Sequence, residues 1–571
     1  MAGIRGAVLS GRDRLVILFG VAVLGILGAA VLLSSDGRTD QPGASTSPTT
    51  STLVEGIVGR ATSINPLMPQ NAADLDMIAL VFSGLTRSFP DGSLGADLAE
   101  GWTISPDGRV YTFTLRAGAT WHDGHPVTAD DVVFTVLTIQ APEYTGPLRA
   151  SWRSVRVEKL DARTVRFTLA EPLGAFLQAT TLPIVPAHRL VGVPVAELRD
   201  AIFNRQPVGS GPYRLARLDF DVAELELAAP PVPSDRPDDL AGGPEFGSRD
   251  AVARIIVRFY PDAASLAGAY RAGLVDTAAG LPPKQALDLE SLPATTVLRY
   301  PSTTLMAVVP NVRPGHRLFA SAAVRRGLLR ALDREAIVSG LFDGAAERAD
   351  SPISPQSWAY DADSTTVHEY DRSAAVSDLK EAGWDRGSPG WRTKGGDAVT
   401  FGLATIDAAS DPLGNALAQR IVTDWTAVGL TVTVVEYDAD GFVAQLVRGN
   451  FDVALLHVNM GLDPDVFPLL TSSQAVEGGS NVGGYQSARL DRLLKAARLG
   501  SDRQARVAAF AALQEALTQD LPILPVAFVD ELYVIRDGVA GPDPRLVADR
   551  SGRFWDVLTW RLADGRATAS P

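Results

Sequence analysis

The segment Phe451–Leu494 reads FDVALLHVNMGLDPDVFPLLTSSQAVEGGSNVGGYQSARLDRLL. Its first part, residues 451–458, is apolar almost throughout and rich in β-branched residues, which predicts a buried strand. The strand is predicted to end at Asn459, and the sequence GLDPD follows as a turn at residues 461–465. Ligands of α/β proteins collect where strands end and loops begin. This turn is therefore predicted to lie at a binding site.

Asp463 and Asp465 lie in that turn, in a stretch without Lys or Arg that extends from Arg448 to Arg489. A carboxylate near the end of a buried strand requires hydrogen bonds or a cation. The cation could be a group of a ligand or a distant arginine. In a second interpretation, the Asp463 side chain caps the helical turn that follows.

The regions on either side of this turn alternate between strand and helix patterns. Residues 399–404 predict a strand, residues 411–428 a helix and residues 430–435 another strand. A further helix at residues 442–447 precedes the strand that starts at Phe451. This βαβ-like order predicts an α/β fold.

The first half of the chain contains two predicted β-hairpins, at residues 102–115 and 155–169. Between them, Thr128 is predicted to cap a helix that carries Asp130 and Asp131 in its first turn, where the helix dipole favours acids.

Composition excludes several classes of protein. The chain has 571 residues, too many for one core, so several domains or lobes are expected. A formal net charge of -14 argues against nucleic acid as a partner. With no cysteine, the chain has no disulfide, no thiolate nucleophile, no cysteine metal site and no lipid-bearing cysteine.

The chain has six histidines, and only His122 and His125 are close in sequence, on either side of Asp123-Gly124. A metal site needs three or four ligands. We therefore predict no metal site and no cofactor.

The amino terminus has the pattern of a membrane anchor. Residues 1–14 contain three arginines that precede the continuous apolar run Leu15–Leu33. That run is long enough to cross a bilayer, and the upstream arginines place the amino end in the cytoplasm. Without a convincing cleavage site, a retained transmembrane helix is favoured over a cleaved signal. Residues 34–52 are rich in Ser, Thr, Pro and Gly and predict a flexible linker, with the main domain, from about Leu53 onward, on the extracytoplasmic face of the cell membrane.

No catalytic motif is present in the sequence. It contains no Walker loop, no G-x-S-x-G elbow and no H-E-x-x-H motif. Ser210 lies in a Gly-Ser-Gly-Pro loop, but Pro212 removes an N–H and the following Tyr213 opens a strand. We therefore predict that the chain is not an enzyme. Trp358, in a loop rich in Pro and Ser, is a candidate wall of a pocket.

An ordered set of short motifs resembles the extracytoplasmic solute-binding proteins of peptide/nickel-type ABC importers, the oligopeptide- and dipeptide-binding class (bacterial family 5). Each motif is weak alone, but the set runs in family order over nearly all of residues 53–560. The motifs are Leu85-Thr86 with Pro90-Asp91-Gly92, Asp97–Trp102, Trp121–Gly124 with Asp130–Phe134, Pro207–Tyr213, Val324–Arg326 with Ala331–Ile337, and Asp463-Pro464 with Asn481, Gly484-Tyr485 and Asp491–Leu494.

The resemblance implies a two-lobed periplasmic-binding-protein-like α/β fold of the class II type, with an extra subdomain on the first lobe. The two lobes would be joined by crossings near Val297–Met306 and Pro522–Val526. The implied division is lobe I at 53–88, the extra subdomain at 89–204, lobe I at 205–296, lobe II at 297–519, and the return to lobe I with the C-terminal tail at 520–571.

The implied function is to capture short peptides, or a similar small solute, by lobe closure and to deliver them to an ABC permease, as a membrane-tethered monomer. One alternative is a sensor or assembly protein that binds a partner segment, and another is a surface hydrolase. Peptide-binding members typically carry an Asp a few residues before the Asp-Pro pair, and this Asp holds the α-amine of the ligand. Here that position falls at about Met460, with Asn459 beside it. Either Asp463 or Asp465 substitutes, or the solute lacks a free α-amine. The candidate ligand-binding residues are Asp463, Asp465, Asn459, Met460, Trp358, Asn71 and Tyr485.

Overall fold

The computed structural model describes residues 51–228, 251–387, 390–499 and 502–563. None of the helices in these stretches combines the length and apolar character that a membrane span requires. The predicted anchor at residues 15–33 and the cytoplasmic segment before it lie outside the described residues, as does nearly all of the predicted linker.

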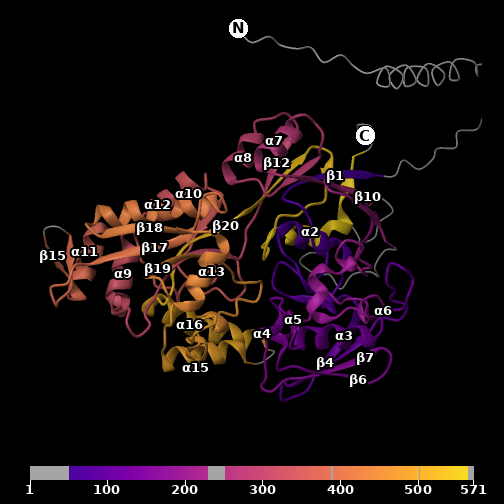
Figure 1. Ribbon diagram of the computed structural model, residues 1–571, viewed down its shortest axis with the longest axis horizontal. Coiled ribbons are helices and arrows are strands. Elements are labelled where there is room, and N and C mark those ends of the chain that lie inside the picture. Colours follow the sequence, from indigo (N-terminus) through magenta and orange to yellow (C-terminus); the bar gives the residue numbers. More distant parts are fainter. Residues whose placement is uncertain (1–50, 229–250, 388–389, 500–501, 564–571) are drawn as a thin grey trace, which may run out of the picture. The chain divides into compact units, whose positions relative to one another are not determined.

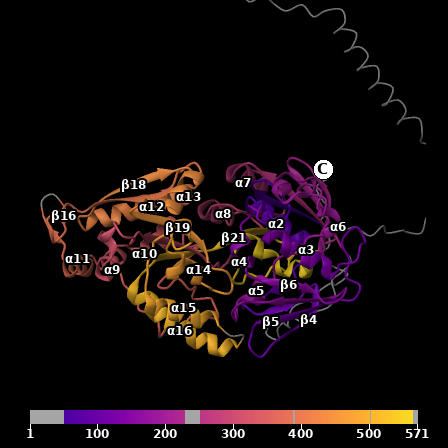
Figure 2. The same cartoon turned by 60° about the horizontal axis from the view of Figure 1, so that its bottom comes forward.

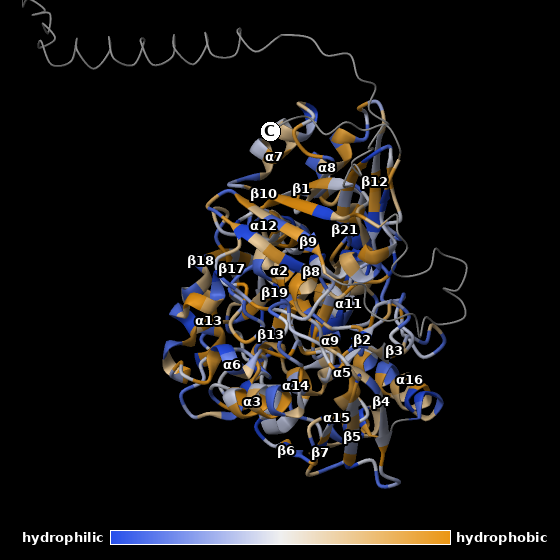
Figure 3. Ribbon diagram, turned by 90° about the vertical axis from the view of Figure 1, so that its right-hand side faces the viewer, coloured by the Kyte–Doolittle hydropathy of each residue, from blue (hydrophilic) through white to orange (hydrophobic). Residues whose placement is uncertain are grey.

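The first half of the fold is built on a seven-stranded sheet with the order β12-β21-β11-β1-β10-β9-β8. Strands β12, β1 and β10 of this sheet are labelled in Figure 1. The central strand β1 pairs in parallel with β10 and β11, and the other pairs in the sheet are antiparallel. Side chains of β10 alternate between half-buried and buried, and the ribbon of β10 in Figure 3 is orange at its hydrophobic residues. This alternation is the period of a strand that packs one face into a core. The strands are β1 (Thr52–Val58), β8 (Tyr213–Leu218), β9 (Val222–Leu227), β10 (Arg254–Tyr260), β11 (Thr277–Ala279), β12 (Thr295–Tyr300) and β21 (Glu531–Arg536).

Helices pack against this sheet from several parts of the chain. Helices α7 (Ala263–Arg271) and α8 (Pro283–Leu289) contact each other, and α7 lies against β1. Helix α2 (Ala72–Val81) packs against the 3-10 helix η6 (Arg550–Thr559), which is close to the C-terminal end of the described chain. Segments about 470 residues apart are thereby joined in one core.

A separate four-stranded antiparallel sheet of the first half has the order β4-β5-β7-β6, and α3 (Ala129–Gln140) contacts β6 and β7 (Figure 2). Both predicted hairpins are confirmed, since β4 pairs with β5 and β6 with β7. The predicted cap of α3 is also confirmed: the Asp131 carboxylate accepts a hydrogen bond from the Thr128 N–H at 2.8 Å. The strands are β4 (Ala99–Ile104), β5 (Val110–Leu115), β6 (Arg156–Lys159) and β7 (Thr164–Thr168).

The second half is built on a six-stranded sheet with the order β14-β20-β13-β19-β17-β18. Strand β17 pairs in parallel with β18 and β19, and α12 (Pro412–Ala427) and α13 (Ala439–Arg448) connect them. This confirms the predicted βαβ order. The strands are β13 (Thr304–Pro310), β14 (Ala346–Arg348), β17 (Thr400–Ile406), β18 (Thr431–Tyr437), β19 (Val453–Asn459) and β20 (Leu524–Val529).

The predicted buried strand at Phe451–Val458 corresponds to β19, between β13 and β17. Its first three residues are buried, while His457 and Asn459 are exposed. Burial therefore ends before the strand does, and its last residues are open to solvent at the end that leads into the acidic turn.

The chain passes between the two large sheets twice. The first passage runs from β12 to β13 through Pro301–Thr303, and the second runs from β20 to β21 through Asp530. The Ser302 hydroxyl donates to the Val529 carbonyl at 2.6 Å, so the two passages are hydrogen-bonded to each other. The apolar run at 521–526, where we expected a crossing, leads into β20, a strand flanked by β13 and β14 that stays in the second sheet.

Candidate functional site

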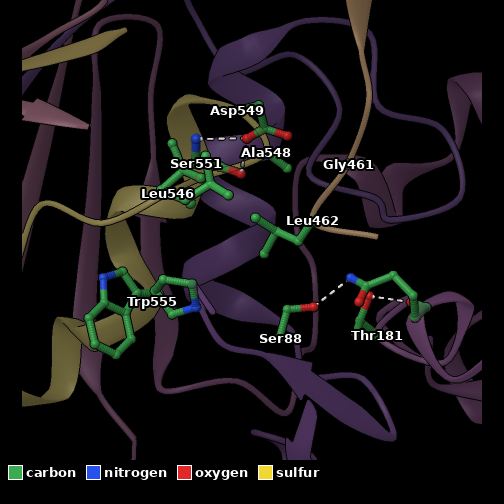
Figure 4. A pocket seen from close by; sticks show the side chains of 13 residues that line it. Ser88, Thr181, Gly461, Leu462, Leu546, Ala548, Asp549, Ser551 and Trp555 are labelled. Atoms are coloured by element: carbon green, nitrogen blue, oxygen red, sulfur yellow. Dashed lines mark hydrogen bonds between the residues drawn. The ribbon is translucent and has the colours of Figure 1, made fainter. Parts of the chain in front are cut away.

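A cavity of about 250 Å³ is the candidate site. Its walls come from three regions: residues 88–90 and 178–181 of the first half, the turn after β19, and residues 546–555, which lead into and form part of η6 (Figure 4). The second region belongs to the second half of the fold, so both halves contribute walls. The lining residues are Ser88, Pro90, Gln178, Thr181, Gly461, Leu462, Leu546, Val547, Ala548, Asp549, Ser551, Gly552 and Trp555.

The lining is largely apolar, with a few polar groups. Gln178 Nε2 donates to Ser88 Oγ at 2.5 Å, and the Asp549 Oδ1 atom accepts from the Ser551 N–H at 2.8 Å. Asp549 is the only charged side chain among the lining residues. Apolar walls with a small number of fixed polar groups are the usual chemistry of a site for a small molecule.

Buried ion pairs hold the wall formed by η6. Arg553 Nη2 lies 2.8 Å from Glu55 Oε1, and Arg553 Nη1 lies 2.6 Å from Asp76 Oδ1. Arg550 Nη2 lies 2.5 Å from the other Asp76 oxygen. Burial acts to lower the pKa of Arg553, but the two carboxylates outweigh it and raise the pKa. Because both arginines belong to η6, these pairs fix the helix that carries Ser551 and Trp555.

Asp463 has an arginine partner within the chain. Both oxygens of its carboxylate accept hydrogen bonds from Arg506 of α16 (Arg503–Asp520), at 2.6 and 2.7 Å. The Arg506 guanidinium also lies over the Trp358 ring, 5.0 Å from its centroid. Of the cations considered for Asp463, the structure places a distant arginine beside it, 43 residues along the chain.

Asp465 has a different role. Its Oδ2 atom pairs with Arg498 Nε at 2.8 Å, and its Oδ1 atom accepts from the Phe467 N–H at 3.2 Å. The second bond reaches the first N–H of α14 (Phe467–Leu470), whose N-cap residue is Val466, so Asp463 is not the N-cap of this helix. Burial raises the pKa of Asp465, and Arg498 offsets only part of that effect.

Asn459 and Met460 lie at the first passage between the sheets. The Asn459 side-chain oxygen accepts from the Thr303 hydroxyl at 3.1 Å and from the Gly461 N–H at 2.8 Å. Met460 is buried, and its N–H donates to the Thr303 carbonyl at 3.1 Å. Both residues therefore connect the passage to the turn that enters the cavity wall.

Trp358 supports the same turn, because its indole N–H donates to the Leu462 carbonyl at 3.1 Å. Tyr485 and Asn71 lie elsewhere: the Tyr485 hydroxyl donates to Asp520 at 3.1 Å, and Asn71 caps α2. None of the seven residues selected from the sequence is among the cavity-lining residues. Five of them, Asp463, Asp465, Asn459, Met460 and Trp358, belong to the turn or contact it.

Sequence reasoning located the turn that contributes Gly461 and Leu462, but it missed the walls formed by Gln178 and residues 546–555. One local signal was available there. Asp549 followed by Ser551 is a typical start of a helical segment, and the Asp549 side chain caps η6. Nothing in the sequence indicated that this segment faces the turn after β19.

One group of side chains in the described ranges could hold a metal ion. It consists of Asp123, His125 and His188, whose potential ligand atoms all lie within 4.8 Å of one another. None of the three lines the cavity.

Comparison with known proteins gives consistent matches. "Protein XP55" of Streptomyces lividans is 30% identical over 521 residues, which cover 90% of this chain and 88% of that protein. The solved structure of the oligopeptide-binding protein AppA from Bacillus subtilis, in complex with a nonapeptide, matches with a TM-score of 0.72 and 26% identity. The structure of NikZ from Campylobacter jejuni, in complex with Ni(L-His), matches with the same TM-score and identity. Each match covers 90% of this chain and 99% of the solved chain, which confirms the expected α/β periplasmic-binding-protein fold.

The family assignment rests on a separate match. Residues 93–479, more than half of the chain, match the family described as "Bacterial extracellular solute-binding proteins, family 5 Middle". Members of this family are binding proteins of transport systems, which confirms the prediction that the chain is not an enzyme. The chain therefore belongs to family 5 of the bacterial extracellular solute-binding proteins, the solute-binding components of peptide/nickel-type ABC importers.

Proposed function

We propose that this protein captures a short peptide, or a similar small solute, in the 250 Å³ cavity and delivers it to an ABC permease. The observation that carries the proposal is the cavity itself, because both halves of the fold contribute its walls. A relative from Pseudomonas aeruginosa that is 26% identical is named "Di/tripeptide-binding protein 1". The cavity is slightly smaller than the roughly 300–1,000 Å³ of drug-sized sites, which favours a solute of a few residues.

The proposed capture requires no covalent chemistry. Closure of two halves on a solute excludes water, and each polar contact with the solute becomes stronger in the drier site. The two passages at Pro301–Thr303 and Asp530 form the proposed hinge, and the division into lobes and an extra subdomain derived from the resemblance forms part of this proposal. We further propose that the protein acts as a monomer tethered by residues 15–33.

Asp549 is the proposed partner of the solute's positive end. Asp463 and Asp465 are each paired with an arginine, and the position at which peptide-binding relatives carry an Asp is occupied by Met460. Asp549 is the cavity's only charged side chain, and its Oδ1 atom accepts the capping bonds from Ser551. A carboxylate at this wall favours an ammonium group over an anion.

The residues selected from the sequence enter the proposal as supports of the solute-binding turn. Asn459 and Met460 connect the turn to the first passage, and Trp358 and Asp463 connect it to α16. We propose that this set fixes Gly461 and Leu462 against the solute. Asn71 and Tyr485 remain proposals from the sequence.

The test is calorimetric titration with a panel of dipeptides, tripeptides and their N-acetylated forms. We expect unmodified peptides to bind, and Asp549→Asn to weaken them at least tenfold, because the ammonium group loses its counter-charge. Asp543→Asn is the matched control, since Asp543 is a nearby surface acid outside the cavity lining. A panel that shows no binding would refute peptide as the solute, and equal affinity of Asp549→Asn and the unaltered protein would refute the role of this carboxylate.

A further inference from the structure

An exposed turn between β5 and α3 carries two side chains that can ligate a metal. Asp123 and His125 flank Gly124, whose φ of +86° lies in the left-handed region that glycine adopts without strain. The turn is closed by the Gly124 N–H, which donates to the Trp121 carbonyl at 2.8 Å. Asp123 and His125 are therefore held on one side of a tight and well-defined turn.

The third side chain comes from another element. His188 lies in the short helix α6 (Ala187–Leu190), 65 residues from Asp123. Its Nε2 atom lies 2.9 Å from Asp123 Oδ2, and His125 Nδ1 lies 3.2 Å from Asp123 Oδ1. The two imidazole rings stack with their centroids 4.3 Å apart. Three potential ligands thus converge from two segments of the chain.

The spacing of these atoms is close to what a metal centre requires. Ligands at about 2.1 Å from a tetrahedral zinc ion lie roughly 3.4 Å from one another. The three potential ligand atoms lie within 4.8 Å of one another before any ion draws them together. The side chains are also accessible, because Asp123 is 25%, His188 28% and His125 61% exposed.

A buried carboxylate fixes the two segments relative to each other. Asp131, at the start of α3, accepts a hydrogen bond from the Ala187 N–H at 2.9 Å and another from the Trp121 indole N–H at 3.4 Å. The Asp131 side chain therefore holds α6, which carries His188, and Trp121, which precedes Asp123, in fixed positions. His122 takes no part, since its Nε2 atom is hydrogen-bonded to the Gly211 carbonyl at 3.0 Å.

We propose that Asp123, His125 and His188 form a binding site for one borderline divalent cation, Zn²⁺ or Ni²⁺, with water in the remaining positions. Two imidazoles and one carboxylate select these ions over Mg²⁺ and Ca²⁺, which prefer a complete shell of oxygen ligands. The site lies outside the cavity, so it is independent of solute capture. The ion links the turn to α6 and holds the two segments together.

The test is titration of the full chain, purified without an affinity tag, with ZnCl₂ or NiCl₂ in a calorimeter. We expect one ion per chain, at least tenfold weaker binding by His125→Asn and by His188→Asn, and no binding of Mg²⁺. His316→Asn is the matched control, because His316 also lies beside a single carboxylate, that of Asp452 at 3.8 Å, but no second histidine completes a site there. X-ray absorption of the nickel-loaded protein should show two imidazole ligands.

Three results would overturn the proposal. The first is the absence of stoichiometric Zn²⁺ and Ni²⁺ binding, which would mean that the cluster only fastens the turn to α6. The second is unchanged affinity in the His125→Asn and His188→Asn variants. The third is loss of metal binding in Asp549→Asn with retention in His188→Asn, which would place the ion in the cavity instead. Near-ultraviolet circular dichroism of the metal-free variants checks that each is folded.

Discussion

Replacing Arg553 by Met should destabilise the protein more than any surface substitution. The Arg553 side chain is 2% exposed, and it pairs with Glu55, which is 0% exposed, and with Asp76, which is 2% exposed. Methionine has a similar length but no charge, so the variant isolates the loss of the guanidinium. After the substitution, Asp76 keeps its pair with Arg550 at 2.5 Å, whereas Glu55 forms no other ion pair within the described part of the chain.

The magnitude follows from the cost of leaving one charge buried without its partner, which is about 3–5 kcal/mol. Glu55 would retain hydrogen bonds from the hydroxyl groups of Tyr533 and Thr277, so we expect the lower part of that range, about 3 kcal/mol. Adding Glu55→Gln should then restore more than about 1 kcal/mol, because the unpaired charge is removed while an oxygen acceptor for the hydroxyls remains.

Urea unfolding followed by tryptophan fluorescence measures these free energies, with the slope of the transition as a check that the unfolded state is unchanged. Arg545→Met is the matched control. Arg545 pairs with Asp543 at 3.1 Å, but the two side chains are 49% and 37% exposed, so the loss should stay below about 1 kcal/mol. A cost below about 1 kcal/mol for Arg553→Met, equal to that of the control, would refute the reasoning. Because Arg553 holds η6, we also expect weaker solute binding in this variant.

Three other perturbations test separate parts of the structure. Burial raises the pKa of Glu531, at the proposed hinge, from 4.5 to about 7, so its contribution to stability is full below pH 4.5 and is lost as the pH rises through about 7. Glu531→Gln should make the urea midpoint depend less on pH between 5 and 7, and an identical pH profile would contradict this. Arg506→Met should cost about 3 kcal/mol in urea unfolding, because its nearly buried carboxylate partner loses its cation; an unchanged midpoint would exclude that role. Gly209→Ala should destabilise by about 1–3 kcal/mol, since the added methyl group overlaps a backbone carbonyl oxygen, whereas Gly268→Ala, in open space on a helix, should stabilise by up to about 1 kcal/mol. Equal melting temperatures of these two alanine variants would contradict the packing argument.

The elements that could be predicted from the sequence are those whose signals are local. The strand β19, the helix α12 and the cap at Thr128 depend on residues a few positions apart, and the structure confirms each of them. The fold was predicted from the order of the family motifs along the chain. Each motif is weak alone, but a set of motifs in a fixed order is specific. The turn at 461–465 was also predicted from a local signal, because its residues directly follow the apolar strand.

The candidate site was predicted only in part, because its contacts join distant segments. A run of apolar residues shows that residues 521–526 are buried, but not which sheet they enter, since burial has the same pattern in either sheet. The arginine that pairs with Asp463 lies 43 residues away, and the wall at 546–555 faces a turn about 90 residues earlier in the sequence. No periodicity carries information over such separations.

The sequence by itself determined the local elements, since hydrophobic period and capping depend on neighbouring residues, and its resemblance to a known family implied the α/β solute-binding fold. Only the tertiary structure decided which carboxylates are paired with arginines of the chain and which can contact a ligand. It paired Asp463 and Asp465 with arginines, left Asp549 in the cavity wall, and brought His188 to Asp123 and His125. The physical reason is that electrostatic partners are chosen by distance in space, and packing of the sheets and helices sets that distance.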